Sequence, residues 1–76
     1  MSIQVLFFGV IAEQQKTKAL TIHGEDGMTV AKVMAKLGIS PSKALLIAVN
    51  EQQQHDIEFP VHDGDEVAIM PPFSGG

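Results

Sequence analysis

One helical segment stands between two groups of strand-like segments, and this order constrains the fold more than any other feature. Residues 30–37 place apolar side chains at the spacing of a single helix face: Val30, Val33, Met34 and Leu37. Thr29 is a good N-cap, and Gly38 stands where helices commonly end in a left-handed residue. One main helix is therefore expected, with an apolar face that a sheet must cover.

Alternating apolar residues predict the strands of that sheet. Residues 2–8 and 18–23 alternate before the helix, and residues 66–70 alternate after it. Residues 45–50 form a third predicted strand whose nearly unbroken apolar character suggests partial cover on both faces and leaves its inward residues unassigned. The predicted fold class is α+β, with a mixed sheet of four to five strands packed on one main helix and the last strand beside the first.

The remaining segments are interpreted as connections. Residues 9–17 read as a polar link, and residues 51–54 read as a hairpin loop. Residues 57–61 form a minor strand or turn that Pro60 interrupts, and Pro41 can start a single helical turn.

The alternation also assigns the two faces of the sheet. The side chains expected to meet the helix and form the core are Ile3, Val5, Phe7, Leu20, Ile22, Val67 and Ile69. Phe8 and Met70 are expected on the opposite face, near Leu6 and Ala68. An apolar patch at that position is interpreted as a docking surface, which is favoured over ordinary surface hydrophobicity or cover by a loop.

Composition excludes several classes of function. The 76 residues make one small domain with little room for an enclosed catalytic cavity. The absence of cysteine excludes disulfides, thiolate metal sites and thiol catalysis. A net charge of −4, without arginine, tryptophan or tyrosine, argues against nucleic-acid binding and suits a basic protein partner.

The same sequence argues against membranes and metals. No apolar run approaches the length of a membrane span, and the first residues lack the basic start of a signal peptide, so a cytoplasmic protein is expected. His23, His55 and His62 show no metal-ligand spacing, and no metal site is expected. Asp63 and Asp65 flank a glycine as turn-forming residues do, so a structural role is favoured for them.

The chain ends in Pro71-Pro72-Phe73-Ser74-Gly75-Gly76. Two terminal glycines arise by chance in about one chain in 200, and a frayed end or a cloning remnant is the trivial explanation. However, the glycines follow the last predicted strand by only four residues, two of which are prolines with a fixed φ that favours an extended stalk. Residues 1–70 are therefore interpreted as the domain and residues 71–76 as an extended tail.

Three segments carry a resemblance to a known family. They are Val5-Leu6-Phe7-Phe8-Gly9, Ala48-Val49-Asn50, and the stretch from Asp63-Gly64-Asp65-Glu66-Val67-Ala68 to the terminal Pro-Pro-Phe-Ser-Gly-Gly. Together with the element order, they make the chain resemble the ubiquitin-like sulfur carriers of β-grasp fold, and most of all the small subunits of molybdopterin synthase. The middle segment alone is a weak signal, whereas the last stretch is a strong one.

The resemblance implies a function for the tail. In that family the terminal carboxylate is adenylated and converted to a thiocarboxylate, which donates sulfur to a cyclic pyranopterin in molybdenum cofactor synthesis. Carried over, Gly76 is the reacting residue, and Gly75 passes the narrowest part of the partner's channel. Phe8, Met70, Pro71, Pro72, Phe73 and Ser74 are the expected partner-binding residues.

The resemblance also implies partners. They are the large subunit of molybdopterin synthase, with which a heterotetramer forms, a ubiquitin-activating-type adenylating enzyme and a sulfur-donating enzyme. This chain would bind no cofactor, since the activating enzyme uses the ATP, and it would be a non-catalytic subunit of a sulfurtransferase.

Chemistry supports the same interpretation. A carboxylate with a pKa of about 3.5 is ionised at neutral pH and is a poor electrophile until it is activated. Glycine leaves its carbonyl carbon open to attack because it has no Cβ. Three alternatives stay open: a sulfur carrier of the thiamine pathway, a protein modifier conjugated through Gly76, and a simple binding module.

Overall fold

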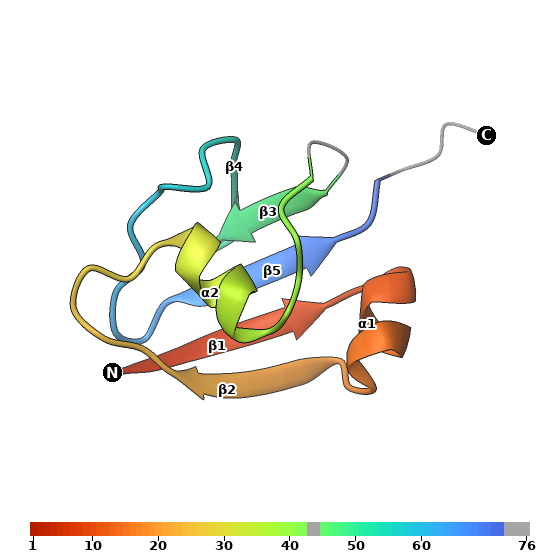
Figure 1. Cartoon of the computed structure of the whole chain (residues 1–76), viewed down its shortest axis with the longest axis horizontal. Coiled ribbons are helices and arrows are strands. Elements are labelled where there is room, and N and C mark those ends of the chain that lie inside the picture. Colours follow the sequence, from red (N-terminus) through yellow and green to blue (C-terminus); the bar gives the residue numbers. More distant parts are fainter. Residues whose placement is uncertain (43–44, 73–76) are drawn as a thin grey trace.

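The computed structural model describes residues 1–42 and 45–72. In these residues the chain forms β1 (Ser2–Phe7), α1 (Gly9–Gln15), β2 (Ala19–His23), α2 (Val30–Lys36), β3 (Leu46–Val49), β4 (Gln52–Gln54) and β5 (Glu66–Met70). The five strands make one sheet in the order β2-β1-β5-β3-β4, and α2 crosses one face of it (Figure 1). This is the predicted mixed sheet of the β-grasp arrangement.

The first and last strands are neighbours, as predicted. β1 and β5 run parallel, with Val5 opposite Val67 and Phe7 opposite Ile69. The β1–β2, β3–β5 and β3–β4 pairs are antiparallel. β5 therefore lies inside the sheet, between β1 and β3.

The core lies between the sheet and α2, and every buried side chain of the described residues is apolar. The sheet contributes Ile3, Val5, Phe7, Ile47, Val49, Val67 and Ile69. The helices and loops contribute Ile11, Met28, Val30, Val33, Met34 and Val61. The prediction for Leu20 is wrong: it shares the face of Val5, but β2 is an edge strand and leaves 41% of this residue exposed.

The main helix has the predicted ends. The Thr29 hydroxyl accepts a hydrogen bond from the Lys32 amide at 3.2 Å, which satisfies one of the free amides of the first turn. At the other end, Gly38 adopts a φ of +71°, the left-handed conformation that commonly follows a helix. Local sequence is therefore sufficient to define this helix.

The connections differ more from expectation. Residues 9–15, interpreted as a polar link, form α1 and bury Ile11 against the core. Gln52–Gln54, taken for a loop, forms the edge strand β4, and residues 57–61 form only an isolated bridge between Pro60 and Thr29. Residues 40–42, where Pro41 suggested a helical turn, have no regular structure. None of the described helices is long and apolar enough to span a membrane.

Candidate functional site

The chain leaves the sheet at the end of β5 (Figure 1). The last contact of the β1–β5 ladder is the Phe8 amide, which donates to the Ile69 carbonyl at 3.2 Å. Pro71 and Pro72 follow β5 and have no amide hydrogen, so they cannot extend the pairing. Phe73, Ser74, Gly75 and Gly76 lie outside the described residues, and their predicted roles stay predictions.

Pro71 is seated against Gly9, the first residue of α1. A Cβ added at Gly9 would lie 2.9 Å from Pro71 Cγ and 3.5 Å from Pro71 Cδ. Ordinary carbon–carbon contacts are about 3.5–4.0 Å, so only glycine leaves room for the proline ring in this position. Gly9 also has a φ of +55°, which most side chains disfavour.

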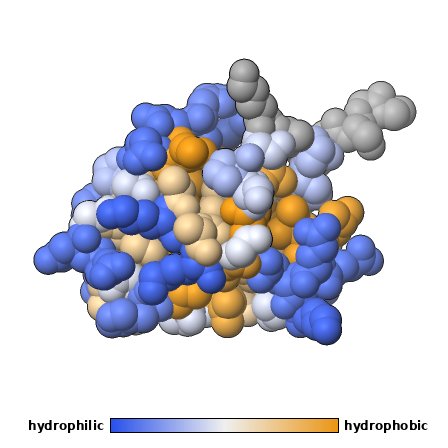
Figure 2. Space-filling model, in the orientation of Figure 1, coloured by the Kyte–Doolittle hydropathy of each residue, from blue (hydrophilic) through white to orange (hydrophobic). Residues whose placement is uncertain are grey.

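The two prolines line a shallow groove together with α1. Its other wall is the chain between α2 and β3, and the lining side chains include Val10, Ile11, Ile39 and Leu45. Figure 2 shows apolar surface in this part of the molecule, beside α1. The root of the tail therefore lies against a surface that α1, unpredicted from the sequence, helps to build.

The face of the sheet opposite α2 carries a second apolar surface. Strand register places Leu6 beside Ala68, Ala68 beside Ala48, and Met70 beside Leu46. These residues alternate with the buried ones, so they face away from the core. Phe8 continues the same alternation and is 46% exposed.

We call the residues Leu6, Phe8, Leu46, Ala48, Ala68 and Met70 the outer patch. The structure confirms the predicted location of Phe8, Met70, Leu6 and Ala68 on this face. Leu46 and Ala48 were missed because the unbroken apolar run of residues 45–50 has no period from which to assign faces. A shallow hollow lined by Leu6, Phe8, Gly9, Ala12, Lys18 and Ala19 borders the patch.

The opposite end of the sheet is held by a polar cluster. Asn50 Nδ2 donates to Asp65 Oδ1 at 3.0 Å, and the His62 amide donates to Asp65 Oδ2 at 2.7 Å. The Asp63 carboxylate accepts from the Ser2 amide at 2.7 Å. The two aspartates thus tie the turn before β5 to β1 and β3, as the structural interpretation of this turn predicts.

These hydrogen bonds change the acidity of Asp65. The bond from Asn50, and after it the bond from His62, stabilise the ionised form and lower the pKa of the Asp65 carboxyl below its ordinary value. Partial burial opposes this shift, and the nearby His62 ring adds to it. A carboxylate held in its ionised form by such bonds fits a structural role better than proton transfer.

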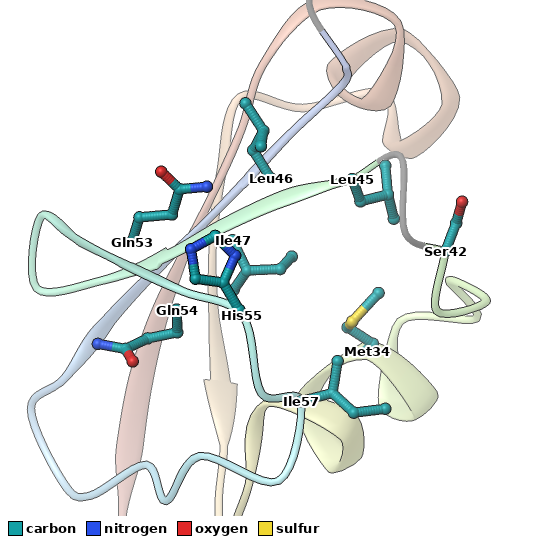
Figure 3. A pocket seen from close by; sticks show the side chains of 9 residues that line it. All are labelled: Met34, Ser42, Leu45, Leu46, Ile47, Gln53, Gln54, His55 and Ile57. Carbon is teal, nitrogen blue, oxygen red and sulfur yellow. The ribbon is translucent and has the colours of Figure 1, made fainter.

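A further hollow lies between α2 and the β3–β4 edge (Figure 3). Its lining combines the apolar side chains of Met34, Leu46 and Ile57 with the amides of Gln53 and Gln54 and the imidazole of His55. Among residues 1–42 and 45–72, no three His, Asp or Glu side chains converge as metal ligands would. This hollow brings together no set of groups typical of a catalytic site.

Comparison with known proteins gives a family and a set of similar structures. The profile of the ThiS family matches residues 5–76. SAMP1 of Haloferax volcanii matches with a TM-score of 0.87 and 19% identity over 100% of both chains. The putative molybdopterin converting factor subunit 1 of Pyrococcus furiosus matches with a TM-score of 0.82 and 17% identity, over 95% of this chain and 98% of the other.

A third similar structure contains a complex. A chain in the complex of subunits 1 and 2 of the molybdopterin-converting factor of Helicobacter pylori matches with a TM-score of 0.70 and 25% identity over 100% of both chains. No curated protein sequence gives a significant match. The structural likenesses bear out the fold, and the profile extends to the two terminal glycines.

Proposed function

Because the chain belongs to the ThiS family of ubiquitin-like sulfur carriers, we propose that it carries sulfur as a thiocarboxylate on Gly76. We propose further that it donates this sulfur to a cyclic pyranopterin, as the small subunit of molybdopterin synthase. The observation that carries the proposal is the family match, which runs through the domain and the tail to residue 76.

The proposed chemistry takes place at the Gly76 carboxylate. A carboxylate oxygen attacks the α-phosphorus of ATP, pyrophosphate leaves, and an acyl adenylate forms. A hydrosulfide equivalent from the sulfur-donating enzyme then attacks the carbonyl carbon, and AMP leaves. The thiocarboxylate sulfur next attacks a carbon of the pyranopterin, and the carbon–oxygen bond at that carbon breaks as the oxygen leaves with a proton or with its phosphate. Water then cleaves the acyl–sulfur bond, which leaves the sulfur on the pterin and restores the Gly76 carboxylate.

This chain contributes position rather than catalytic groups. The groove beside the two prolines is lined by the polar side chains of Gln14, Gln15, Ser40 and Ser42, and no histidine, aspartate or glutamate is among its described lining residues. The activating enzyme would bind the ATP, and the large subunit would bind the pterin. Phe8 and Met70, in the outer patch beside the tail root, are the residues that we propose contact these partners.

Two observations support the molybdopterin branch. The approach to the glycines, Met70-Pro71-Pro72-Phe73, resembles that branch more than the thiamine branch. The likenesses to converting-factor subunits, one of them in a complex with a second subunit, agree with a heteromeric assembly. The heterotetramer belongs to this proposal.

A protein modifier is the second candidate, because SAMP1, a small archaeal modifier protein, has a closely similar fold. A modifier would use the same acyl adenylate but would pass Gly76 to a lysine amine instead of to sulfur. The thiamine-pathway carrier is a third candidate, since it needs the same thiocarboxylate. The three differ only in the acceptor.

The test is intact-mass spectrometry of the protein after incubation with an activating enzyme, ATP and a sulfur source. Oxidation of any of the four methionines adds nearly the same nominal mass as exchange of oxygen for sulfur, so a thioacid-specific label is needed as well. We expect labelling that requires both ATP and Gly76. Absence of labelling with every competent activating enzyme would overturn the proposal.

The acceptor is tested with the labelled protein. Addition of large subunit and cyclic pyranopterin should consume the thiocarboxylate and return the carboxylate form. If the large subunit and the pyranopterin leave the thiocarboxylate unconsumed, and a separate incubation with ATP and a cell extract links Gly76 to lysines, the chain is a modifier.

A further inference from the structure

Gly9 stands where three parts of the molecule meet. It follows the last residues of β1, it begins α1, and its backbone faces the ring of Pro71. Its φ of +55° turns the chain from the strand into the helix. Gly9 thus sets the direction of α1 relative to β1, and its lack of a side chain leaves space for Pro71, the first residue of the tail.

Other contacts also hold Pro71 in its position against Gly9. The Phe8 amide donates to the Ile69 carbonyl at 3.2 Å, so the residue before Gly9 is tied to β5 two residues before Pro71. Pro71 is half-buried, and α1 is anchored to the core through Ile11. The first residue of the tail, Pro71, therefore lies against α1, and the packing of Ile11 in the core holds that helix in place.

We propose that Gly9 is a positioning residue for the carrier reaction, because the space it leaves for Pro71 sets the direction in which the tail leaves the domain. This inference rests on the proposed function. It concerns a residue that touches no reacting atom and acts only through Pro71. A side chain at residue 9 would push the proline ring aside, because 2.9 Å is too short for a carbon–carbon contact.

The length of the tail amplifies a change at its root. Six residues from Pro71 to Gly76 span at most ~20 Å when extended in a partner's site. A tilt of about 10° at the root would then displace the end by about 3 Å. Misplacement of a reacting group by about 1 Å can lower a rate by about 100-fold, so a small shift at Gly9 is expected to matter.

The experiment compares Gly9→Ala with Gly64→Ala. Gly64 has a φ of +83°, and a Cβ there would meet no atom within 4 Å, so this control suffers similar backbone strain far from the tail. The measurement is the rate of ATP-dependent thiocarboxylation at saturating and at limiting carrier. We expect kcat to fall about tenfold or more for Gly9→Ala and to change less than about twofold for Gly64→Ala.

A double-mutant cycle separates positioning from stability. Pro71→Ala removes the Cγ and Cδ atoms that a Cβ at residue 9 would meet, so Gly9→Ala should cost less in that background. Thermal unfolding of all four proteins, measured alongside, shows how much of any rate loss follows from lost structure. Equal rate losses for Gly9→Ala in both backgrounds would overturn the positioning role.

A structural measurement distinguishes failure of the proposed function from failure of the positioning role of Gly9. An NMR nuclear Overhauser effect between the Gly9 Hα and the Pro71 ring protons tests the contact without any activity, and its absence would overturn the inference by itself. If the wild-type protein shows this contact but is never thiocarboxylated, the proposed function fails and the positioning role fails with it. If wild type and Gly9→Ala are loaded at equal rates, only the positioning role fails.

Discussion

Asn50 and Asp65 are joined across the β3–β5 pair by a hydrogen bond of 3.0 Å from Asn50 Nδ2 to Asp65 Oδ1. Asn50 Oδ1 also accepts the Glu66 amide at 3.0 Å, so one side chain holds both the turn and the start of β5. Asn50 has a φ of +51°, a conformation that asparagine tolerates better than most residues. Two of the segments that carry the family resemblance therefore meet in one structural cluster.

The lowered pKa of Asp65 predicts a pH dependence of stability. A carboxyl group with a lower pKa in the folded state adds stability above its unfolded pKa of about 3.9 and loses it as pH falls through the folded value. We expect Asp65→Asn to lower the free energy of unfolding by about 1 kcal/mol at pH 7, because its amide cannot accept both hydrogen bonds.

The measurement is urea unfolding between pH 7 and pH 2. Asp65→Asn should lie nearer to wild type at the acidic end of this range than at pH 7. Asp26→Asn, at an exposed carboxylate in the loop before α2, is the control and should stay close to wild type throughout. An equal destabilisation by Asp65→Asn at every pH would contradict the account of the pKa.

Ile11 and Val10 provide a test of α1. Ile11 is 6% exposed and belongs to the core, whereas its neighbour Val10 is 51% exposed. Ile11→Ala should lower the free energy of unfolding by about 2 kcal/mol or more, and Val10→Ala by less than about 0.5 kcal/mol. Thermal or urea unfolding measures both, and similar losses for the two variants would show that α1 does not pack as described.

Phe8 and Leu20 provide a test of the outer patch. Both are large and exposed, at 46% and 41%, but Phe8 lies in the patch and Leu20 lies at the β2 edge on the other face. We expect Phe8→Ala to weaken binding to the large subunit about tenfold, which corresponds to ~1.4 kcal/mol. Leu20→Ala should have little effect in the same calorimetric titration, and equal effects would argue against this patch as the docking surface.

Deletion of Gly76 separates function from folding. The core of the described residues is built from side chains between Ile3 and Ile69, and the tail is interpreted as a separate segment, so we expect the melting temperature to change by less than about 2 °C. Thiocarboxylation should be abolished. If the deletion lowers the melting temperature by several degrees, the tail stabilises the domain and its assignment as a separate segment is wrong.

The sequence predicted the parts of the fold in which local pattern and tertiary packing agree. The apolar stripe and end residues of α2, and the alternation of β1 and β5, specify those elements directly. The adjacency of the first and last strands was predicted from the order of the elements, and the β1–β5 ladder confirms it. Leu20 was misplaced because alternation identifies a face but does not show that β2 is an edge strand with little cover.

The short elements could not be predicted for a physical reason. α1 has seven residues and a single buried one, and its polar run of Glu13, Gln14 and Gln15 hides the apolar face. A helix of this length is not stable alone and forms only because Ile11 reaches the core. Likewise, three glutamines make β4 a strand only because β3 offers a pairing edge.

The candidate site was predicted in part. Phe8 and Met70 lie on the expected face, but the seat of Pro71 at Gly9 is a contact between residues 62 positions apart and depends on α1. The pattern of residues along a short segment cannot predict a contact between positions so far apart in the sequence. A glycine between a strand and a helical segment is the only signal that could have suggested it.

The placement of β5 has a mechanical consequence. The start of β1 and the end of β5 lie at opposite ends of two parallel neighbouring strands (Figure 1). A pull on the chain beyond Met70, resisted at the first residues, therefore loads the β1–β5 ladder in shear, so that its hydrogen bonds must break together and not one after another. The domain would therefore resist a pull along the chain beyond Met70 better than a pull that opens a strand pair one hydrogen bond at a time.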